Sequence, residues 1–255
     1  GDVAVKISLT GLKGGHSGVD IHLGRANANK LMFRFLKEAV RDYGARLSSI
    51  DGGSLRNAIP REAFAIITIP GDNVEALWEL VSDYQEMYRS EYKGIEHNIN
   101  FTAEMTDMPA TLIPEEIQDD LINAIEGCQN GVISMLVDFP GTVESSTNLA
   151  IVKSSNEMIE IQILVRSSSE SRKEAVCSSL ESIFSLAGAK VEYSDGYGGW
   201  QPNIDSPILK IMQQAYLDLY GKKPEAKVMH AGLECGIIQE SYPDMDMISI
   251  GPDLQ

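Results

Sequence analysis

The pattern of hydrophobic and polar positions changes period early in the chain, and this change marks the first two elements. Apolar and polar residues alternate from position 3 to position 10, as in a half-buried strand. After a glycine-rich stretch, apolar residues recur at spacings of three and four, which predicts an amphipathic helix. Its buried side would carry Ala28, Leu31, Met32, Phe35, Leu36 and Ala39.

The next segments complete a recognisable α/β unit. We expect strands at 46–50 and 63–69, a helix over the apolar positions between 74 and 84, and a strand within 95–104. The order strand, helix, strand, strand, helix, strand is that of a ferredoxin-like unit. The predicted fold class is therefore α/β (α+β), with a βαββαβ arrangement in the first half of the chain.

A shorter version of this pattern follows from Pro114. Helices are expected at 115–125 and 172–186, and strands at 131–135, 143–153, 158–165 and 189–193. The turn signal at 154–156 would pair the two longest of these strands. We expect this second half to extend the sheet of the first.

The glycine- and proline-rich stretch 195–203, DGYGGWQPN, breaks the rhythm as domain junctions do. Beyond it we expect a strand–turn–helix–strand fragment. A helix at 207–219 would precede a strand near 226–229, the turn HAGLECG, a further helix and a buried strand at 245–250. The chain starts with Gly1 and stops shortly after this last strand, so we expect it to be a piece of a longer protein.

Composition narrows the range of functions. The chain has 21 Lys and Arg against 37 Asp and Glu, a net charge of −16, which argues against nucleic acid as a partner. Its three cysteines are far apart and odd in number, which favours a reducing compartment over a disulfide framework. No apolar run approaches the roughly 18 residues that cross a bilayer. We expect a cytoplasmic protein with no membrane partner.

The stretch GLKGGHSGVD places one histidine, His16, in a glycine-rich turn between strand and helix. Ser17 and Asp20 fit a capping-box-like helix start, which would put His16 beside free N–H groups and the positive end of a helix dipole. The glycines would let the backbone turn sharply and approach another group. The alternative is a histidine that only caps the helix or touches solvent. The spacing fits neither a nucleophile elbow nor a phosphate loop.

Two further residues stand at element ends. Asn57, in RNAIP, lies between a turn and a strand, where it could also serve only to bond its own backbone. Arg166 ends the apolar strand IEIQILVR and could hold a carboxylate through two parallel hydrogen bonds, or simply end a strand in solvent.

His230 and Glu234 lie four residues apart in MHAGLECG, with Cys235 adjacent. On a helix this spacing could bind zinc. Gly232 falls between them and the stretch follows an expected strand, so a turn is favoured and no self-contained metal site is expected in this chain.

Taken together, several motifs closely resemble the aminoacyl-histidine dipeptidases (Xaa-His dipeptidases, the carnosine-cleaving bacterial type), members of the di-zinc aminoacylase and carnosinase metallopeptidases. The motifs run in order from near the first residue to Pro252: GLKGGHSGVDIHLGRANANKL, DGGSLRNAIPREAFA, LAGAK, GWQP, HAGLECG and PDMDMISIGP. The resemblance implies a lid or dimerisation domain at 1–199, in halves of about 1–110 and 111–199. Residues 200–255 would belong to the catalytic domain.

The resemblance also implies a reaction and roles. The parent enzyme would hydrolyse dipeptides that end in histidine, of the β-alanyl-histidine type, with two zinc ions bound by parts absent from this chain. His16 would donate a hydrogen bond to the oxyanion, Asn57 and Arg166 would hold the substrate, and Gly232 would line its pocket. The partners implied are the dipeptide, the remainder of the catalytic domain and, in a homodimer, a second copy of the chain.

A rival hypothesis from another class is a ferredoxin-like regulatory or dimerisation module that binds a small ligand and has no catalytic role. The segment from Trp200 to the end discriminates between the two, because a free-standing module has no need of it.

Overall fold

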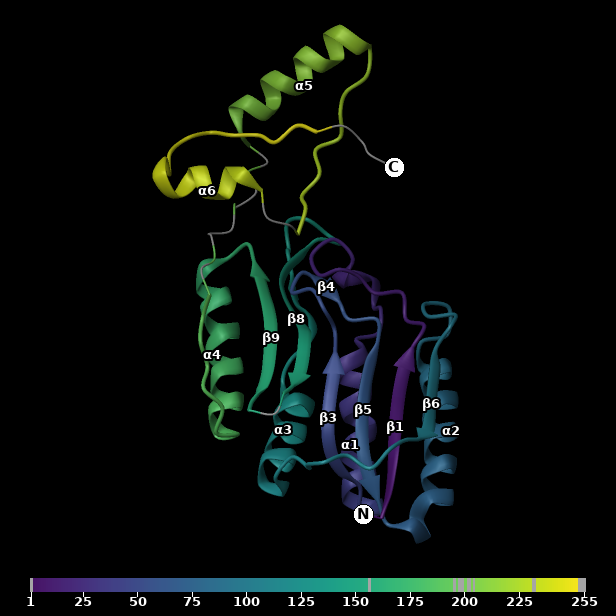
Figure 1. The fold of residues 1–255 in the computed structure, drawn as a ribbon. Coiled ribbons are helices and arrows are strands. Elements are labelled where there is room, and N and C mark those ends of the chain that lie inside the picture. Colours follow the sequence, from purple (N-terminus) through teal and green to yellow (C-terminus); the bar gives the residue numbers. More distant parts are fainter. Residues whose placement is uncertain are drawn as a thin grey trace.

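The centre of the molecule is one seven-stranded sheet in which every pair of neighbouring strands is antiparallel. The computed structural model describes residues 2–155, 157–194, 196, 200, 203, 205–230 and 233–251. The strands of the sheet are β1 (Val3–Thr10), β3 (Arg46–Gly52), β5 (Ala63–Ile69), β6 (Asn100–Met105), β7 (Gly131–Met135), β8 (Val143–Ser154) and β9 (Ile159–Ser167). Four helices cover one face of it (Figure 1): α1 (Ala28–Tyr43), α2 (Val74–Glu91), α3 (Glu115–Gly127) and α4 (Glu170–Leu186).

The first half has the predicted ferredoxin-like topology. Its elements follow one another as β1, α1, β3, β5, α2 and β6, and its strands lie side by side in the order β6-β1-β5-β3. Alternate residues of β1 explain the packing, because Val5, Ile7 and Leu9 are fully buried against the helices. The last strand begins at Asn100, later than predicted, because Ile95 and Glu96 donate their N–H groups to the Tyr92 carbonyl in the turn that ends α2.

The second half extends this sheet through β8, as predicted. One end of β8 pairs with β7, its other end pairs with β3 at Asp51 and Gly52, and β9 runs along its opposite edge. Asn27 joins the halves, since its Oδ1 accepts the N–H groups of Asn29 and Lys30 and so caps α1. Its Nδ2 donates to the Leu149 carbonyl on β8 at 3.0 Å.

The core lies between the sheet and the four helices. Phe35, Tyr84, Tyr88 and Phe101 pack edge to face at its centre, with ring centroids 4.9–5.8 Å apart. Helices α3 and α4 add Ile125, Leu180 and Phe184 to the same cluster, so the two halves share one core.

Three predicted strands are absent. Residues 189–193, 226–229 and 245–250 form no strand ladder, and 245–250 are half-buried or exposed where a buried strand was expected. A strand needs a neighbour to pair its backbone groups, and within the described residues these three segments have none. The prediction rested on local sequence pattern and element order, which do not show whether a pairing partner exists.

The C-terminal segment lies beyond one end of the sheet (Figure 1) and contains α5 (Pro207–Tyr220) and α6 (Glu234–Ser241). In the described part of this segment no residue belongs to the main core. Large apolar side chains are instead exposed, including Ile211 at 65%, Leu219 at 76% and Ile250 at 71%. None of the described helices combines the length and the apolar character that crossing a membrane requires.

Candidate functional site

His16 lies on a two-residue strand whose partner strand, β4 (Ala58–Ile59), is at the end of the sheet nearest the C-terminal segment (Figure 1). In the pairing of β2 (Gly15–His16) with β4, His16 stands opposite Ala58. The almost fully buried Asn148 of β8 donates from Nδ2 to the Ala58 carbonyl at 2.7 Å. The small hairpin is therefore fixed to the main sheet, and His16 with it.

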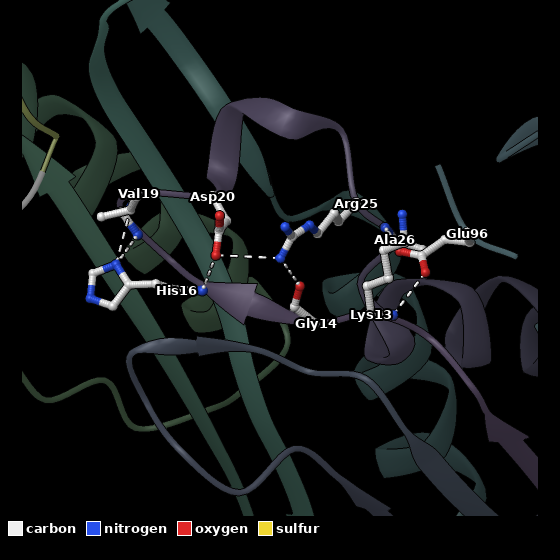
Figure 2. Close-up of polar contacts among 9 residues, drawn as sticks. Lys13, Gly14, His16, Val19, Asp20, Arg25, Ala26 and Glu96 are labelled. Atoms are coloured by element: carbon white, nitrogen blue, oxygen red, sulfur yellow. Dashed lines mark hydrogen bonds and ion pairs between the residues drawn. The ribbon is translucent and has the colours of Figure 1, made fainter. Parts of the chain in front are cut away.

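A tight turn, rather than a helix, follows His16. The His16 N–H donates to Asp20 Oδ2 at 2.8 Å, and the Asp20 N–H donates to the His16 carbonyl at 3.0 Å (Figure 2). The predicted helix start at Ser17 and Asp20 is wrong: α1 begins at Ala28 with Asn27 as its cap. The Asp20 carboxylate accepts the His16 N–H, and the buried Ser17 hydroxyl accepts from Arg166, so neither side chain caps a helix. Asp20 directly precedes a short 3₁₀ helix (Ile21–Leu23) but makes no capping hydrogen bond to it.

The N–H donors expected beside the imidazole are present, but they belong to this turn. Nδ1 of His16 accepts from the N–H groups of Gly18 at 3.0 Å and Val19 at 3.1 Å (Figure 2). A ring nitrogen that accepts two hydrogen bonds carries no proton, so in the neutral ring the proton is on Nε2. Burial, and next the nearby Arg166 cation, lower the pKa of His16, while Asp20 acts in the opposite direction. Near pH 7 the ring is therefore neutral and presents an Nε2–H donor.

Arg166, on β9, meets the His16 turn although about 150 positions separate the two in sequence. Its Nε lies 3.4 Å from the Ser17 hydroxyl, and its side chain is half-buried. A Cβ placed on Gly18 would lie 3.2 Å from Cε1 of His16 and 3.3 Å from Nε of Arg166. The glycine therefore lets the imidazole and the guanidinium approach one another, and Arg166 is not a solvated strand end.

His230 approaches the same place from the C-terminal segment. Its Nε2 lies 2.7 Å from the hydroxyl of Ser146, which stands opposite Arg166 in the β8–β9 register. Burial, with Arg166 second, lowers the pKa of His230 to about 4, although a hydrogen bond to the Val143 backbone opposes this. Sequence reasoning missed Ser146, because a serine within a strand carries no signal of its own.

The structure gives less support for the other residues that were predicted at the site. The Asn57 carbonyl accepts the Ser17 N–H at 2.9 Å, while its exposed side chain makes no hydrogen bond to any described residue, its own backbone included. Gly232 lies outside the described residues. His230 precedes α6 and Glu234 begins it, so the two do not share a helix face, as the turn hypothesis requires.

Metal ligands form no cluster in the described part of the chain. No group of three or more His, Cys, Asp or Glu side chains there comes close enough together to hold an ion. The site instead contains the Arg166 cation near the imidazoles of His16 and His230, whose lowered pKa values keep them neutral near pH 7, and the Asp20 carboxylate, which accepts the His16 N–H. Such an arrangement suits an anionic or polar ligand.

The chain is similar in sequence and in structure to known proteins. Residues 7–96 match the family model of the peptidase dimerisation domain. The cytosol non-specific dipeptidase of Escherichia coli K12 is 42% identical over 249 residues, which is 98% of this chain and 51% of that protein. The crystal structure of aminoacylhistidine dipeptidase from Vibrio alginolyticus superposes with a TM-score of 0.93 at 42% identity, again covering 98% of this chain and 51% of that one.

Residues 7–96 are thus similar to the peptidase dimerisation domain. The chain as a whole is similar to the two dipeptidases over 98% of its length and spans about half the length of each of them.

Proposed function

We propose that the parent protein is a dipeptidase, and that this chain supplies its lid, residues 1–199, and part of its catalytic domain, residues 200–255. The names of the two relatives support peptide hydrolysis, and the second supports dipeptides that end in histidine. The β-alanyl-histidine type is what the sequence resemblance adds. The exposed apolar side chains of α5 and α6 support a further part of the catalytic domain packed on this segment.

The main support for the proposal is the orientation of the His16 ring. Hydrolysis of a peptide bond passes through a tetrahedral intermediate whose oxygen bears a negative charge, and a donor aimed at that oxygen lowers the barrier. Two backbone N–H groups hold Nδ1 of His16, which leaves Nε2–H to donate. Because the pKa of His16 is lowered, the ring acts as a neutral donor near pH 7 and transfers no proton.

Arg166 is the proposed carboxylate-binding residue. It is a permanent cation half-buried beside His16, which suits the C-terminal carboxylate of a dipeptide next to the bond to be cleaved. The exposed Asn57 amide would add a hydrogen bond to the substrate, and its carbonyl ties it to the His16 turn through Ser17. Gly232 would border the same pocket.

Metal ions have no fitting place among the described residues of this chain. We therefore place the metal site, two zinc ions according to the resemblance, in the remainder of the parent, and derive no step through it. We also propose a cytoplasmic location and a homodimer. The name of the Escherichia coli relative, the three free cysteines and the dimerisation-domain match support these proposals.

The alternative, a free-standing regulatory module, has less support. The match to the dipeptidase relatives covers 98% of the chain and so extends beyond the ferredoxin-like unit into the C-terminal segment. A module without a catalytic domain would not need that segment.

Replacing His16 by alanine in the full-length enzyme tests the proposal. We expect kcat for β-alanyl-histidine to fall by about 10²–10³-fold, the usual loss when one oxyanion donor is removed. The matched control is His22→Ala, which removes an exposed histidine of the same loop and should leave kcat unchanged. An unchanged kcat in His16→Ala would show that the ring is only structural.

A further inference from the structure

We propose that Asp20 and Arg25 form a positioning pair that fixes the direction of the His16 Nε2–H bond. The inference rests on the proposed donor role of His16. Neither residue touches the ring nitrogens. Each acts through the backbone of the loop that carries the ring.

Asp20 holds the peptide of His16 from both sides. Its carboxylate accepts the His16 N–H at 2.8 Å and its own N–H donates to the His16 carbonyl at 3.0 Å. The turn closed in this way brings the N–H groups of Gly18 and Val19 onto Nδ1. The orientation of the ring, and the nitrogen that keeps the proton, therefore depend on the turn that Asp20 closes.

Arg25 holds Asp20 in turn. Its Nη1 lies 3.3 Å from Asp20 Oδ2 and donates to the Gly14 carbonyl at 2.6 Å, so one guanidinium links both sides of the turn (Figure 2). About three quarters of each side chain is buried, with 23% of Arg25 and 26% of Asp20 exposed, so solvent screens the pair less than a surface ion pair.

The pair also explains why a glycine directly precedes His16. Gly15 has φ of 144°, and a Cβ there would overlap Nη1 of Arg25 and lie 2.6 Å from Asp20 Oδ2. Gly14, with φ of 63°, offers its carbonyl to the same guanidinium. Sequence analysis assigned these glycines to an approach toward another group. The structure shows that the group approaching Gly15 is the Asp20–Arg25 pair itself, whereas a Cβ on Gly14 would meet the Ile59 carbonyl and the Arg61 side chain.

A second carboxylate, that of Glu96, fixes the two ends of the loop (its base), so the Asp20–Arg25 pair determines only the conformation around His16 (its tip). Glu96, 4% exposed, accepts the N–H groups of Lys13 at 2.8 Å and Ala26 at 3.1 Å, the residues where the loop leaves and rejoins the body (Figure 2). The contacts of Asp20 and Arg25 lie within the loop, at Gly14 and His16. Their loss should therefore change the tip without disturbing the core.

The test measures kcat and KM for β-alanyl-histidine with the full-length enzyme. Asp20→Ala should lower kcat by about 10- to 100-fold, the range that a small misplacement of a reacting group costs, with KM changed less than threefold. Asp20→Asn keeps an oxygen acceptor and should lose less. Asp42→Asn, which removes an exposed Arg41 partner at the far end of α1, is the control and should match the parent.

Combining substitutions separates this inference from the proposed function. If Asp20 acts through His16, His16→Ala with Asp20→Ala should lose no more kcat than His16→Ala alone. Losses that multiply would overturn the positioning role, and so would parental kcat in Asp20→Ala. If His16→Ala itself has the kcat of the parent enzyme, the hypothesis that is refuted is the proposed donor role of His16.

A spectroscopic readout covers the case in which Asp20→Ala is unstable. In protein labelled with ¹⁵N-histidine, the parent should show His16 with the proton on Nε2, and Arg25→Gln should show a mixture of tautomers. Arg25→Lys keeps the cation and should restore part of the parental signal. An unchanged Nε2–H signature in Arg25→Gln would refute the pair.

Discussion

Gly18 is the residue at which three separate segments meet. A side chain there would overlap the His230 carbonyl and press on both Cε1 of His16 and Nε of Arg166. Its N–H at the same time donates to Nδ1 of His16. The small size of one residue thus decides how closely the loop, β9 and the C-terminal segment approach.

His230 makes the contact of the C-terminal segment dependent on pH. Its ordinary pKa is 6.5, and in the folded chain burial and then Arg166 lower the pKa to about 4. The detached segment therefore binds a proton more readily than the attached one. The attachment is at full strength above pH 6.5 and weakens as the pH falls toward 4.

Hydrogen exchange of residues 226–230 in the full-length enzyme, followed from pH 7 to pH 4 with the intrinsic pH dependence removed, measures this effect. Protection should decrease through that window in the parent. In His230→Gln, whose side chain cannot titrate, the protection should stay constant between pH 7 and pH 4. In the control His97→Gln, which replaces an exposed histidine, the protection should change with pH as in the parent. Protection that rises as the pH falls would contradict the assignment.

The candidate site could be predicted from sequence only in part. His16 stood out because a histidine among three glycines is an unusual local pattern, and Arg166 because it ends an apolar strand. The contact of Ser146 with His230 was not predictable, because it depends on the long-range register that sets Ser146 opposite Arg166.

At the scale of elements, Lys30 joins α1 to the end of α3. Its ammonium donates to the carbonyl groups of Ile125 at 2.6 Å, Glu126 at 2.8 Å and Cys128 at 3.1 Å. These groups lie at the C-terminus of α3, where carbonyls lack partners within the helix and the helix dipole attracts a cation. A side chain of the first half, that of Lys30, thereby caps the C-terminus of a helix in the second half.

Lys30→Met keeps the length of the side chain and removes the ammonium. We expect a loss of about 1–3 kcal/mol in the free energy of unfolding, the usual cost of leaving buried polar groups without a donor. Thermal unfolding of the full-length protein measures it. Lys37→Met on the same helix is the control, and equal effects of the two substitutions would argue against the capping role.

Elements with a clear period were predictable, whereas those that need a distant partner were not. The strands β5 and β7 have the predicted bounds, and β8 extends one residue further than predicted, because alternation or β-branched composition marks them locally. The segments 226–229 and 245–250 have similar composition but no ladder partner among the described residues, so they form no strand. The start of α1 was misplaced because the side chains of a capping signal were already used within the His16 turn.

At the scale of the whole molecule, the chain carries the proposed oxyanion donor and the proposed carboxylate-binding residue, and its described part holds no cluster of three or more metal-ligating side chains. We therefore expect residues 1–255 alone to show no hydrolysis of β-alanyl-histidine in the presence of zinc, while the full-length enzyme hydrolyses it. Substantial turnover by the isolated chain would refute the placement of the metal site. A folding check by circular dichroism accompanies the assay.

Strand β8 holds the hairpin of Asn57 through Asn148, holds His230 through Ser146 and pairs along its length with the strand of Arg166. This one strand thus connects the hairpin of His16, the proposed oxyanion donor, with Arg166, the proposed carboxylate-binding residue. Any closure of the lid would move these two side chains together, so their spacing is set before a dipeptide binds and only their distance from the rest of the enzyme would change.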